Sequence, residues 1–379
     1  MAASDLGLYL HLPWCESKCP YCDFNSYAID GDMPIDAYVA ALCEDIAVQH
    51  RSVHGRTLCS IFIGGGTPSL FPGHAIETVL SALRQTFDCP TDIEVTLEAN
   101  PGSVELARLD QYRAAGVNRL SIGIQTFDAD ALAILGRQHS ATEAKAALAT
   151  ARAAGFDNVN LDIMYALPGQ RVAAALADLE VVLDDPPEHV SWYQLTLEPG
   201  TRFHHKPPPL PDDDTVAAMQ DAGLALLSAA GFERYEVSAY ARPGRRCRHN
   251  LNYWRFGDYL ALGAGAHGKL TDSAGWPARY ERPRNPRRYQ RARPALDDAL
   301  TPISSSQVAF EFFLNTLRLT DGHRFDALPT LDAAAANALQ DCLATAEGRG
   351  LLERPAPGKF RASPLGYRFL NDLQTLFLP

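Results

Sequence analysis

The chain has 379 residues, of which 46% are hydrophobic and 21% are charged, a composition ordinary for a globular protein. Its formal net charge of −11 argues against a broad nucleic-acid surface, and no run approaches the roughly 20 apolar residues of a membrane span. The start MAASDLGLYLHLPW lacks the basic and apolar regions of a signal peptide, so we expect a cytoplasmic protein.

Short apolar runs alternate with amphipathic helical stretches from residue 7 to about 240. The runs are apolar along most of their length, which is typical of strands covered on both faces. Helices are expected between them, for example over residues 34–49 and 142–155. The expected strands span residues 8–12, 60–63, 93–98, 119–125, 159–166, 191–198 and 235–240.

A weak internal repeat supports this alternation. The segments RAAGVNRLSIGIQ, RAAGFDNVNLDIMYA and SAAGFERYEVSAY each place a glycine (Gly116, Gly155 or Gly231) between a helix and a strand, where a left-handed residue is favoured. A recurring βα unit predicts a parallel sheet. We therefore expect an α/β protein built on a partial TIM-like (β/α)6 barrel, with its chemistry at the carboxyl ends of the strands. A flat doubly wound sheet is the competing geometry.

The pattern becomes irregular after residue 245 and passes through a basic, proline-containing stretch at 281–294. The tail predicts two helices (305–319 and 331–348), then strand, turn, strand and helix, which is compatible with a small α+β, winged-helix-like domain. The acidic chain makes a packing role for that domain more plausible than DNA binding. The expected division is a barrel over 1–240, a linking region over 241–300 and a C-terminal domain over 301–379.

Three of the eight cysteines, Cys15, Cys19 and Cys22, lie within CESKCPYC, directly after the first expected strand. Thiolates are the ligands that iron–sulfur clusters use, and a four-iron cluster held by three of them keeps one iron open for another ligand. The alternative is a structural zinc site completed by His11 or a distant cysteine. Zinc sites more often use two ligand pairs far apart in sequence, and no second C-x2-C is present.

The segment YLHLPWCESKCPYCDF resembles the start of radical S-adenosylmethionine (SAM) proteins. Its surroundings resemble the coproporphyrinogen III dehydrogenase-like branch of these proteins, and the heme chaperones within that branch. The resemblance covers nearly the whole chain. It implies a radical SAM barrel in which the three cysteines hold a [4Fe–4S] cluster, and in which the cluster binds SAM and splits it reductively.

A glycine-rich segment, GGGTPS, follows the second expected strand. Bare backbone at a strand end lets a ligand approach the N–H groups closely, although such a segment alone is only a tight turn. The resemblance implies that it grips the methionine part of SAM. Any single polar residue near a later strand end could instead be a helix cap or a surface ion pair. The cofactor contacts implied by the resemblance are Tyr9, Tyr21, Gly65, Gly66, Thr67, Glu98, Gln125, Arg137 and Asp162.

Two features separate the chaperones from the dehydrogenases of the branch. The resemblance implies a fourth cysteine two residues after the third in the dehydrogenases, and here that position is Phe24. The dehydrogenases also carry a longer segment before the cluster, whereas 14 residues precede Cys15 here. Both differences weaken the dehydrogenase interpretation.

The segment CRHNLNYW contains His249, whose imidazole can ligate heme iron, with Tyr253 and Trp254 beside it as flat apolar surface. Its HNxxYW pattern resembles the heme-binding signature of the chaperones. The alternative is that His249 is a hydrogen-bonded structural residue; His267, in YLALGAGAHGKL, is a second candidate ligand. Four nearby arginines are candidates for binding heme propionates: Arg242, Arg245, Arg246 and Arg248.

The resemblance thus implies a heme chaperone that binds heme and delivers it to respiratory hemoproteins, acting as a homodimer without nucleic acid. Transfer to such acceptors implies transient, peripheral contact with the inner membrane, for which the 281–294 stretch is a candidate. An oxygen-independent coproporphyrinogen III dehydrogenase is the alternative function. A zinc-stabilised binding module is the third.

Overall fold

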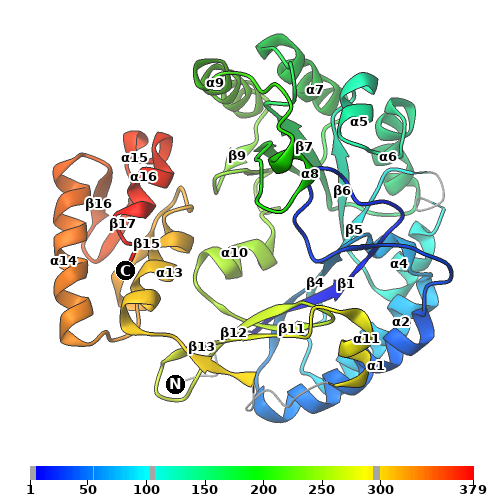
Figure 1. The fold of residues 1–379 in the computed structure, drawn as a ribbon, viewed down its shortest axis with the longest axis horizontal. Coiled ribbons are helices and arrows are strands. Elements are labelled where there is room, and N and C mark those ends of the chain that lie inside the picture. Colours follow the sequence, from blue (N-terminus) through cyan, green and yellow to red (C-terminus); the bar gives the residue numbers. More distant parts are fainter. Residues whose placement is uncertain (1–5, 54, 103–106, 293–298) are drawn as a thin grey trace.

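The computed structural model describes residues 6–53, 55–102, 107–292 and 299–379 (Figure 1). A twelve-stranded sheet in the order β14-β13-β12-β11-β1-β4-β5-β6-β7-β8-β10-β9 takes up the chain as far as Pro302. In Figure 1 this sheet curves around helix α10 (Arg248–Trp254), with most helices on the outside and the C-terminal region beside the open side. The architecture is a partial TIM-like barrel.

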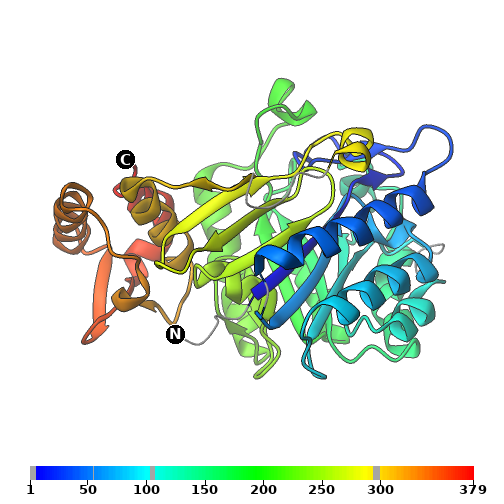
Figure 2. The same ribbon diagram turned by 90° about the horizontal axis from the view of Figure 1, so that it is seen from below.

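The central strands of the sheet are parallel, and those from β1 to β8 are each followed by a helix on the outer face (Figure 2). Their apolar runs are buried on both faces, as the sequence predicted. The strands are β1 Leu6–Leu12, β4 Leu58–Gly65, β5 Glu94–Ala99, β6 Arg119–Gln125, β7 Val159–Tyr165 and β8 His189–Gln194. The outer helices are α1 Ile35–His50, α2 Gly73–Thr86, α4 Leu109–Ala115, α5 Ala129–Ile134, α6 Ala141–Ala153, α7 Val172–Asp184 and α9 Asp213–Ala229.

The predicted left-handed glycines are confirmed. Gly116, Gly155 and Gly231 have φ angles of 100°, 84° and 82°. At the first of them a Cβ atom would also lie 2.1 Å from the Arg84 guanidinium. Each therefore marks a helix end at which the chain turns back into the sheet.

The predicted parallel strand at 235–240 is wrong. The structure divides it into β9 (Glu233–Arg234) and β10 (Ala239–Ala241), and β10 runs antiparallel to both β8 and β9. The cause is a bend between them, where the Glu236 carboxylate accepts a hydrogen bond from the backbone N–H of Ser238 at 2.9 Å. A side chain that bonds the backbone in this way competes with the sheet ladder.

The irregular pattern after residue 245 conceals four further strands of the same sheet. β11 (Asp258–Leu262) runs parallel to β1 on the side opposite β4, although the two are far apart in sequence. β12 (His267–Thr271), β13 (Pro277–Glu281) and β14 (Thr301–Pro302) then extend the sheet as antiparallel strands. The division at 240 and 300 stays a prediction.

A buried ion pair fastens this extension to the barrel. Arg282, directly after β13, donates to the Asp45 carboxylate of α1 at 2.7 Å, and both side chains have no exposed surface. Tyr289, in α11 (Pro286–Arg291), donates to the other carboxylate oxygen at 2.8 Å. Part of the basic 281–294 stretch is therefore structural, while residues 293 and 294 lie outside the described residues.

The C-terminal region has its own apolar core around Phe312, Phe313 and Phe360. A three-stranded antiparallel sheet in the order β15-β17-β16 packs with its helices, which gives the expected small α+β, winged-helix-like fold. Its elements are α13 Ser305–Thr316, β15 His323–Arg324, α14 Ala333–Gly348, β16 Leu352–Ala356, β17 Lys359–Ala362, α15 Pro364–Arg368 and α16 Leu370–Thr375. Among the described residues, no helix combines the length and apolarity needed to cross a membrane.

Candidate functional site

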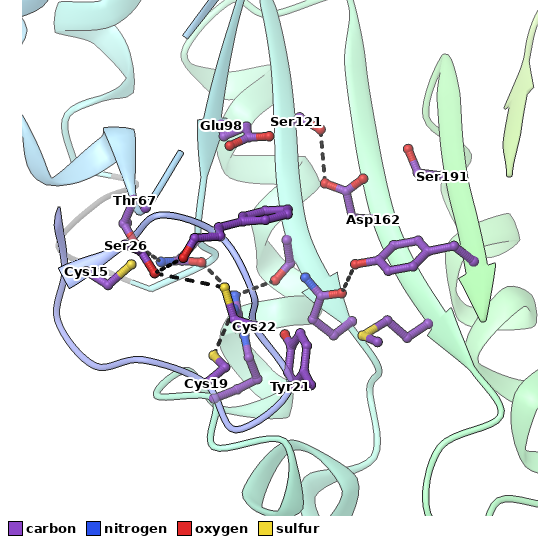
Figure 3. A pocket seen from close by; sticks show the side chains of 18 of the residues that line it. Cys15, Cys19, Tyr21, Cys22, Ser26, Thr67, Glu98, Ser121, Asp162 and Ser191 are labelled. Atoms are coloured by element: carbon purple, nitrogen blue, oxygen red, sulfur yellow. Dashed lines mark hydrogen bonds between the residues drawn. The ribbon is translucent and has the colours of Figure 1, made fainter. Parts of the chain in front are cut away.

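A cavity of about 840 Å³ opens at the carboxyl ends of the parallel strands. The loop after β1 borders it, and polar side chains from β5, β6, β7 and β8 line it in turn, as Glu98, Ser121, Asp162 and Ser191 do in Figure 3. The cavity lies where a TIM-like barrel carries its active site. Its volume falls in the range of small-molecule and cofactor sites.

All three clustered cysteines line this cavity. Cys15 ends β2 (Trp14–Cys15), and Cys19 and Cys22 follow in the same loop. The Arg137 guanidinium donates to the Cys19 sulfur at 3.8 Å, so a cation faces this thiol. Burial raises the pKa of the Cys15 and Cys22 thiols, which means that their thiolates need an electrophilic partner such as iron.

The spread of the three thiols bears on the zinc alternative. Sulfurs that share one zinc ion lie within about 4.6 Å of each other, since each Zn–S bond is about 2.3 Å long. In the part of the chain that the structure describes, no three cysteine, histidine or acidic side chains come close enough to hold a single metal ion. All three thiols line one cavity, which is compatible with the thiolate ligation of an iron–sulfur cluster.

The cysteine loop is anchored by chain segments that lie far from it in sequence, after β11 and β13. The Asn25 amide donates to the carbonyl oxygens of Ala264 and Arg284, both at 2.9 Å. The backbone carbonyl oxygen of Asn25 lies 2.9 Å from His11 Nε2. The loop therefore depends on β1 and on segments more than 230 residues further along the chain.

The glycine segment after β4 packs directly beneath this loop. Gly65 has a φ of 121°, and a Cβ atom on Gly66 would lie 2.5 Å from the Trp14 carbonyl oxygen. The Gly65 N–H donates to Glu98 at 3.1 Å. The glycines are required by close packing as well as by the exposure of backbone to the cavity.

Two carboxyl groups face the cavity from neighbouring parts of the sheet. Burial, with the nearby Asp162 charge, raises the pKa of Glu98 to about 8. Burial also raises the pKa of Asp162, while hydrogen bonds from Asn160 (2.8 Å) and Ser121 (3.0 Å) oppose that shift. The cavity thus offers a protonatable acid at Glu98 and a hydrogen-bonded acceptor at Asp162.

Gln125 and Arg137 are held in place by the cavity wall. Gln125 has a φ of 70°, uncommon for a residue other than glycine, and accepts a hydrogen bond from the Tyr193 hydroxyl at 2.7 Å. Arg137 donates to Asn100 Oδ1 at 2.6 Å and to the Gly123 carbonyl at 2.8 Å. Strain at Gln125 is typical of a residue whose position matters for a site.

Of the cofactor contacts predicted from the sequence, all except Tyr9 line this cavity: Tyr21, Gly65, Gly66, Thr67, Glu98, Gln125, Arg137 and Asp162. Tyr9 lies apart from the lining, with its hydroxyl 3.0 Å from His11 Nδ1 and its ring against Phe62. The sequence did not single out several other lining residues. Polar positions that alternate with apolar ones along the strands were the available signal for Ser121, Ser191 and Tyr193, and the HNxxYW pattern was the signal for Asn250, whereas Asn100 carried none.

Helix α10 carries the HNLNYW motif inside the barrel and turns two faces in different directions. Asn250 and Trp254 line the cavity that the cysteines border. His249 and Tyr253, one position earlier in each case, contact each other with ring centroids 5.0 Å apart. The His249 ring stacks on Phe62 of β4, also at 5.0 Å. The predicted heme residues are therefore divided between two environments.

His249 is 3% exposed. Its Nδ1 lies 3.1 Å from the Ser60 hydroxyl, while its Nε2 is buried with no hydrogen-bond partner among the described residues. Burial, with the Arg119 charge nearby, lowers the pKa of His249 to about 3. The imidazole is thus neutral, as a metal ligand must be, but it is enclosed.

The four arginines near the motif are occupied elsewhere. Arg248 pairs with Asp92 at 3.1 Å, ahead of β5, and Arg245 lies 3.9 Å from Asp157, ahead of β7. Both acids precede their strands, so these arginines lie at the end of the barrel opposite the cavity. Arg246 pairs with Glu233 and Asp321, and Arg242 donates to the Ala230 carbonyl. His267 is half exposed and lies 3.6 Å from Glu281.

The fold and the cysteine-bordered cavity define a radical SAM protein. The family model of the radical SAM superfamily matches residues 9–180. Coproporphyrinogen III oxidase (HemN) from Escherichia coli has the same fold, with a TM-score of 0.81, 22% identity and coverage of 100% of this chain and 91% of that one.

Similar proteins with curated names show to which family of radical SAM proteins the chain belongs. The heme chaperone HemW of Escherichia coli (strain K12) is 44% identical over 373 residues, which is 98% of each chain. A mitochondrial radical S-adenosyl methionine domain-containing protein 1 from Bos taurus is 44% identical over 283 residues, 73% of this chain and 63% of that one. The chain belongs to the HemW family of radical SAM proteins.

Proposed function

We propose that this protein is a heme chaperone, which binds heme through His249 and delivers it to respiratory hemoproteins. The observation that carries the proposal is the full-length identity with proteins named heme chaperone HemW, in a chain that has the HNLNYW motif. The neutral His249 imidazole supports it, since an axial heme ligand must be unprotonated. Tyr253 and Trp254 flank that ligand on the same helix.

The cavity residues fit a resident [4Fe–4S] cluster and SAM. Cys15, Cys19 and Cys22 would hold the cluster, and a cluster with one open iron supplies one-electron reductive cleavage of SAM when both are bound. Glu98 and the glycine segment would border the methionine part of the cofactor, with the Glu98 carboxyl held by the Gly65 N–H. Arg137 keeps a positive charge beside the Cys19 sulfur.

The alternative function is an oxygen-independent coproporphyrinogen III dehydrogenase. The cavity supports it, because the same groups serve a substrate radical reaction. Phe24, which stands where the dehydrogenases are expected to carry a fourth cysteine, is 57% exposed and disfavours it. Incubation of anaerobically reconstituted protein with coproporphyrinogen III, SAM and a reductant separates the two functions. Formation of protoporphyrinogen IX would contradict the chaperone function.

Heme titration followed by absorbance tests the proposal directly. We expect a stoichiometric Soret shift with the wild-type protein and its loss in His249→Ala. The His204→Ala variant is the matched control, since His204 is an exposed histidine of α8 (Arg202–His205) and should leave the shift unchanged. Equal binding by His249→Ala and wild type would remove His249 from the site.

The remaining partners belong to the same proposal. Delivery to respiratory hemoproteins would require transient, peripheral contact with the inner membrane. The family resemblance also implies that the protein is a homodimer. Among the described residues of the 281–294 stretch, Arg287, Arg288 and Arg291 of α11 are exposed cations that could make such contact, whereas Arg282 is buried and Arg284 pairs with Glu281.

A further inference from the structure

The structure encloses the proposed heme ligand. His249 lies between Phe62 and Tyr253, and its Nε2 has no contact with solvent. A porphyrin is a wide, flat ring, and its iron cannot approach this nitrogen while both neighbours keep their positions. Heme ligation therefore requires Phe62 of β4 or helix α10, which carries Tyr253, to change position.

Helix α10 is built to be released as a unit. It has only seven residues, and the backbone is left-handed on either side of it, at Gly244 (φ 76°) and Phe256 (φ 59°). Few residues other than glycine adopt the second conformation, so Phe256 is a strained turn. A short helix between two turns can move with little rearrangement of the sheet.

Ring contacts and hydrogen bonds together retain α10: His249 stacks on Phe62, and Tyr253 stacks on Tyr259 with ring centroids 4.1 Å apart. The Glu94 carboxylate accepts hydrogen bonds from the N–H groups of Arg248 (2.9 Å) and His249 (3.3 Å). Asn252 donates to the Asp258 carbonyl at 2.8 Å, and Ser60 contacts His249 at 3.1 Å. Water can replace each of these hydrogen bonds when the helix moves out, whereas the ring contacts must be given up or formed with the bound porphyrin.

The opposite face of the helix forms part of the cofactor cavity. Asn250 and Trp254 line the same cavity as the cysteines and Glu98. On its other side, the Trp254 ring is covered by the Arg318 guanidinium at 4.1 Å. Arg318 pairs in turn with Glu236, a further lining residue, at 2.8 Å. A ligand that fills the cavity therefore rests on the helix that encloses His249.

We infer that α10 is a movable plug that couples the SAM cavity to the heme ligand, so that SAM bound in the cavity holds His249 enclosed and heme binding displaces the helix. This inference rests on the proposed function. Ligands that favour opposite positions of one element weaken each other's binding by the same factor. SAM would thus act as a regulator of heme capture, independently of its cleavage.

Alkylation of Cys247 reports the position of the helix. This cysteine caps α10, is fully buried and lies 3.5 Å from Glu94. In anaerobically reconstituted protein, we expect hemin to raise the alkylation rate of Cys247 at least tenfold and SAM to lower it, as measured by peptide mass spectrometry. Cys342 of α14 is the control, and its rate should stay the same. Hemin bound through His249 with Cys247 still protected would overturn the inference and leave the proposed function intact.

Hemin affinity with and without SAM tests the coupling. We expect saturating SAM to weaken hemin binding at least fivefold, a typical magnitude for coupled sites, and hemin to weaken SAM binding equally. An unchanged hemin affinity would overturn the coupling. Failure of hemin to bind in the absence of SAM would instead contradict the proposed function, so the two failures are distinguishable.

Discussion

The cofactor cavity and the interior beneath α10 present their polar groups in opposite ways. In the cavity, three thiols and two carboxyls from successive elements face open space, and neighbouring side chains fix their directions. Beneath α10, His249 is packed between rings and directed away from every solvent path. One site is formed before its ligand arrives, whereas the other must be uncovered. The difference shows that a fold can contain a ligand-binding motif whose side chains a ligand in solution cannot reach.

The largest effect is expected from a substitution that prevents the cluster from forming in the open cavity. Cys19→Ser should lose its iron and sulfide after anaerobic reconstitution, from about four irons per chain to background, because two thiols cannot hold the cluster. Iron and sulfide assays measure this, with Cys342→Ser as a control that should load normally. Full iron in Cys19→Ser would show that the three cysteines do not act together.

The second largest effect is expected on the stability of the region that anchors the cysteine loop. Arg282→Met leaves the Asp45 carboxylate buried without its cation, so we expect a loss of about 3–5 kcal/mol in the free energy of unfolding. Urea denaturation measures the loss. Arg284→Met is the matched control: its pair with Glu281 is at the surface and its side chain is 70% exposed, so the change should stay within about 1 kcal/mol. Equal losses would contradict the role of burial.

A pH profile sharpens the description of the open cavity. The pKa of Glu98 is about 8 in the fold and 4.5 in the unfolded chain, so the folded chain holds an extra proton between these values. Stability should therefore fall as the pH rises through this window, by at most about 1.4 kcal/mol per pH unit from this group. Glu98→Gln should flatten the profile, as urea midpoints at pH 5.5 and 8 would show. Parallel profiles for the two proteins would exclude a raised Glu98 pKa.

The smallest effect is expected from a substitution that weakens the contact holding α10 in its enclosed position. Ser60→Ala removes the hydroxyl beside His249 Nδ1, a contact worth about 1 kcal/mol. Because only the enclosed form loses this contact, hemin should bind about fivefold more tightly. Absorbance titration measures the change, with the exposed Ser228→Ala as control. Weaker hemin binding in Ser60→Ala would mean that the hydroxyl serves the bound state instead.

The sequence predicted the barrel and the cavity well, because both depend on local patterns. Apolar runs marked the parallel strands, and Gly116, Gly155 and Gly231 marked the helix ends. The antiparallel β10 was missed since its cause is the Glu236 carboxylate bonding back to Ser238, a contact with no periodic signal. β11 was missed since its partner, β1, lies almost the whole barrel away along the chain.

The depth of a residue was the least predictable property. His249 and Trp254 occur in one short motif, yet only Trp254 lines the cavity. Their separation follows from helical geometry, which directs residues five positions apart to different sides, once the helix lies inside a barrel. Likewise, nothing in the basic stretch distinguished Arg282, which is buried, from Arg284, which is exposed.

The anchoring of the cysteine loop has a consequence for biosynthesis. Asn25 is held by carbonyl groups of Ala264 and Arg284, so the loop attains its final form only after the ribosome has made residues beyond these positions. The first residues of a nascent chain leave the ribosome well before residues 264 and 284 have been synthesised. A chain truncated before residue 264 would therefore lack both of the contacts that hold the segment carrying the three cysteines.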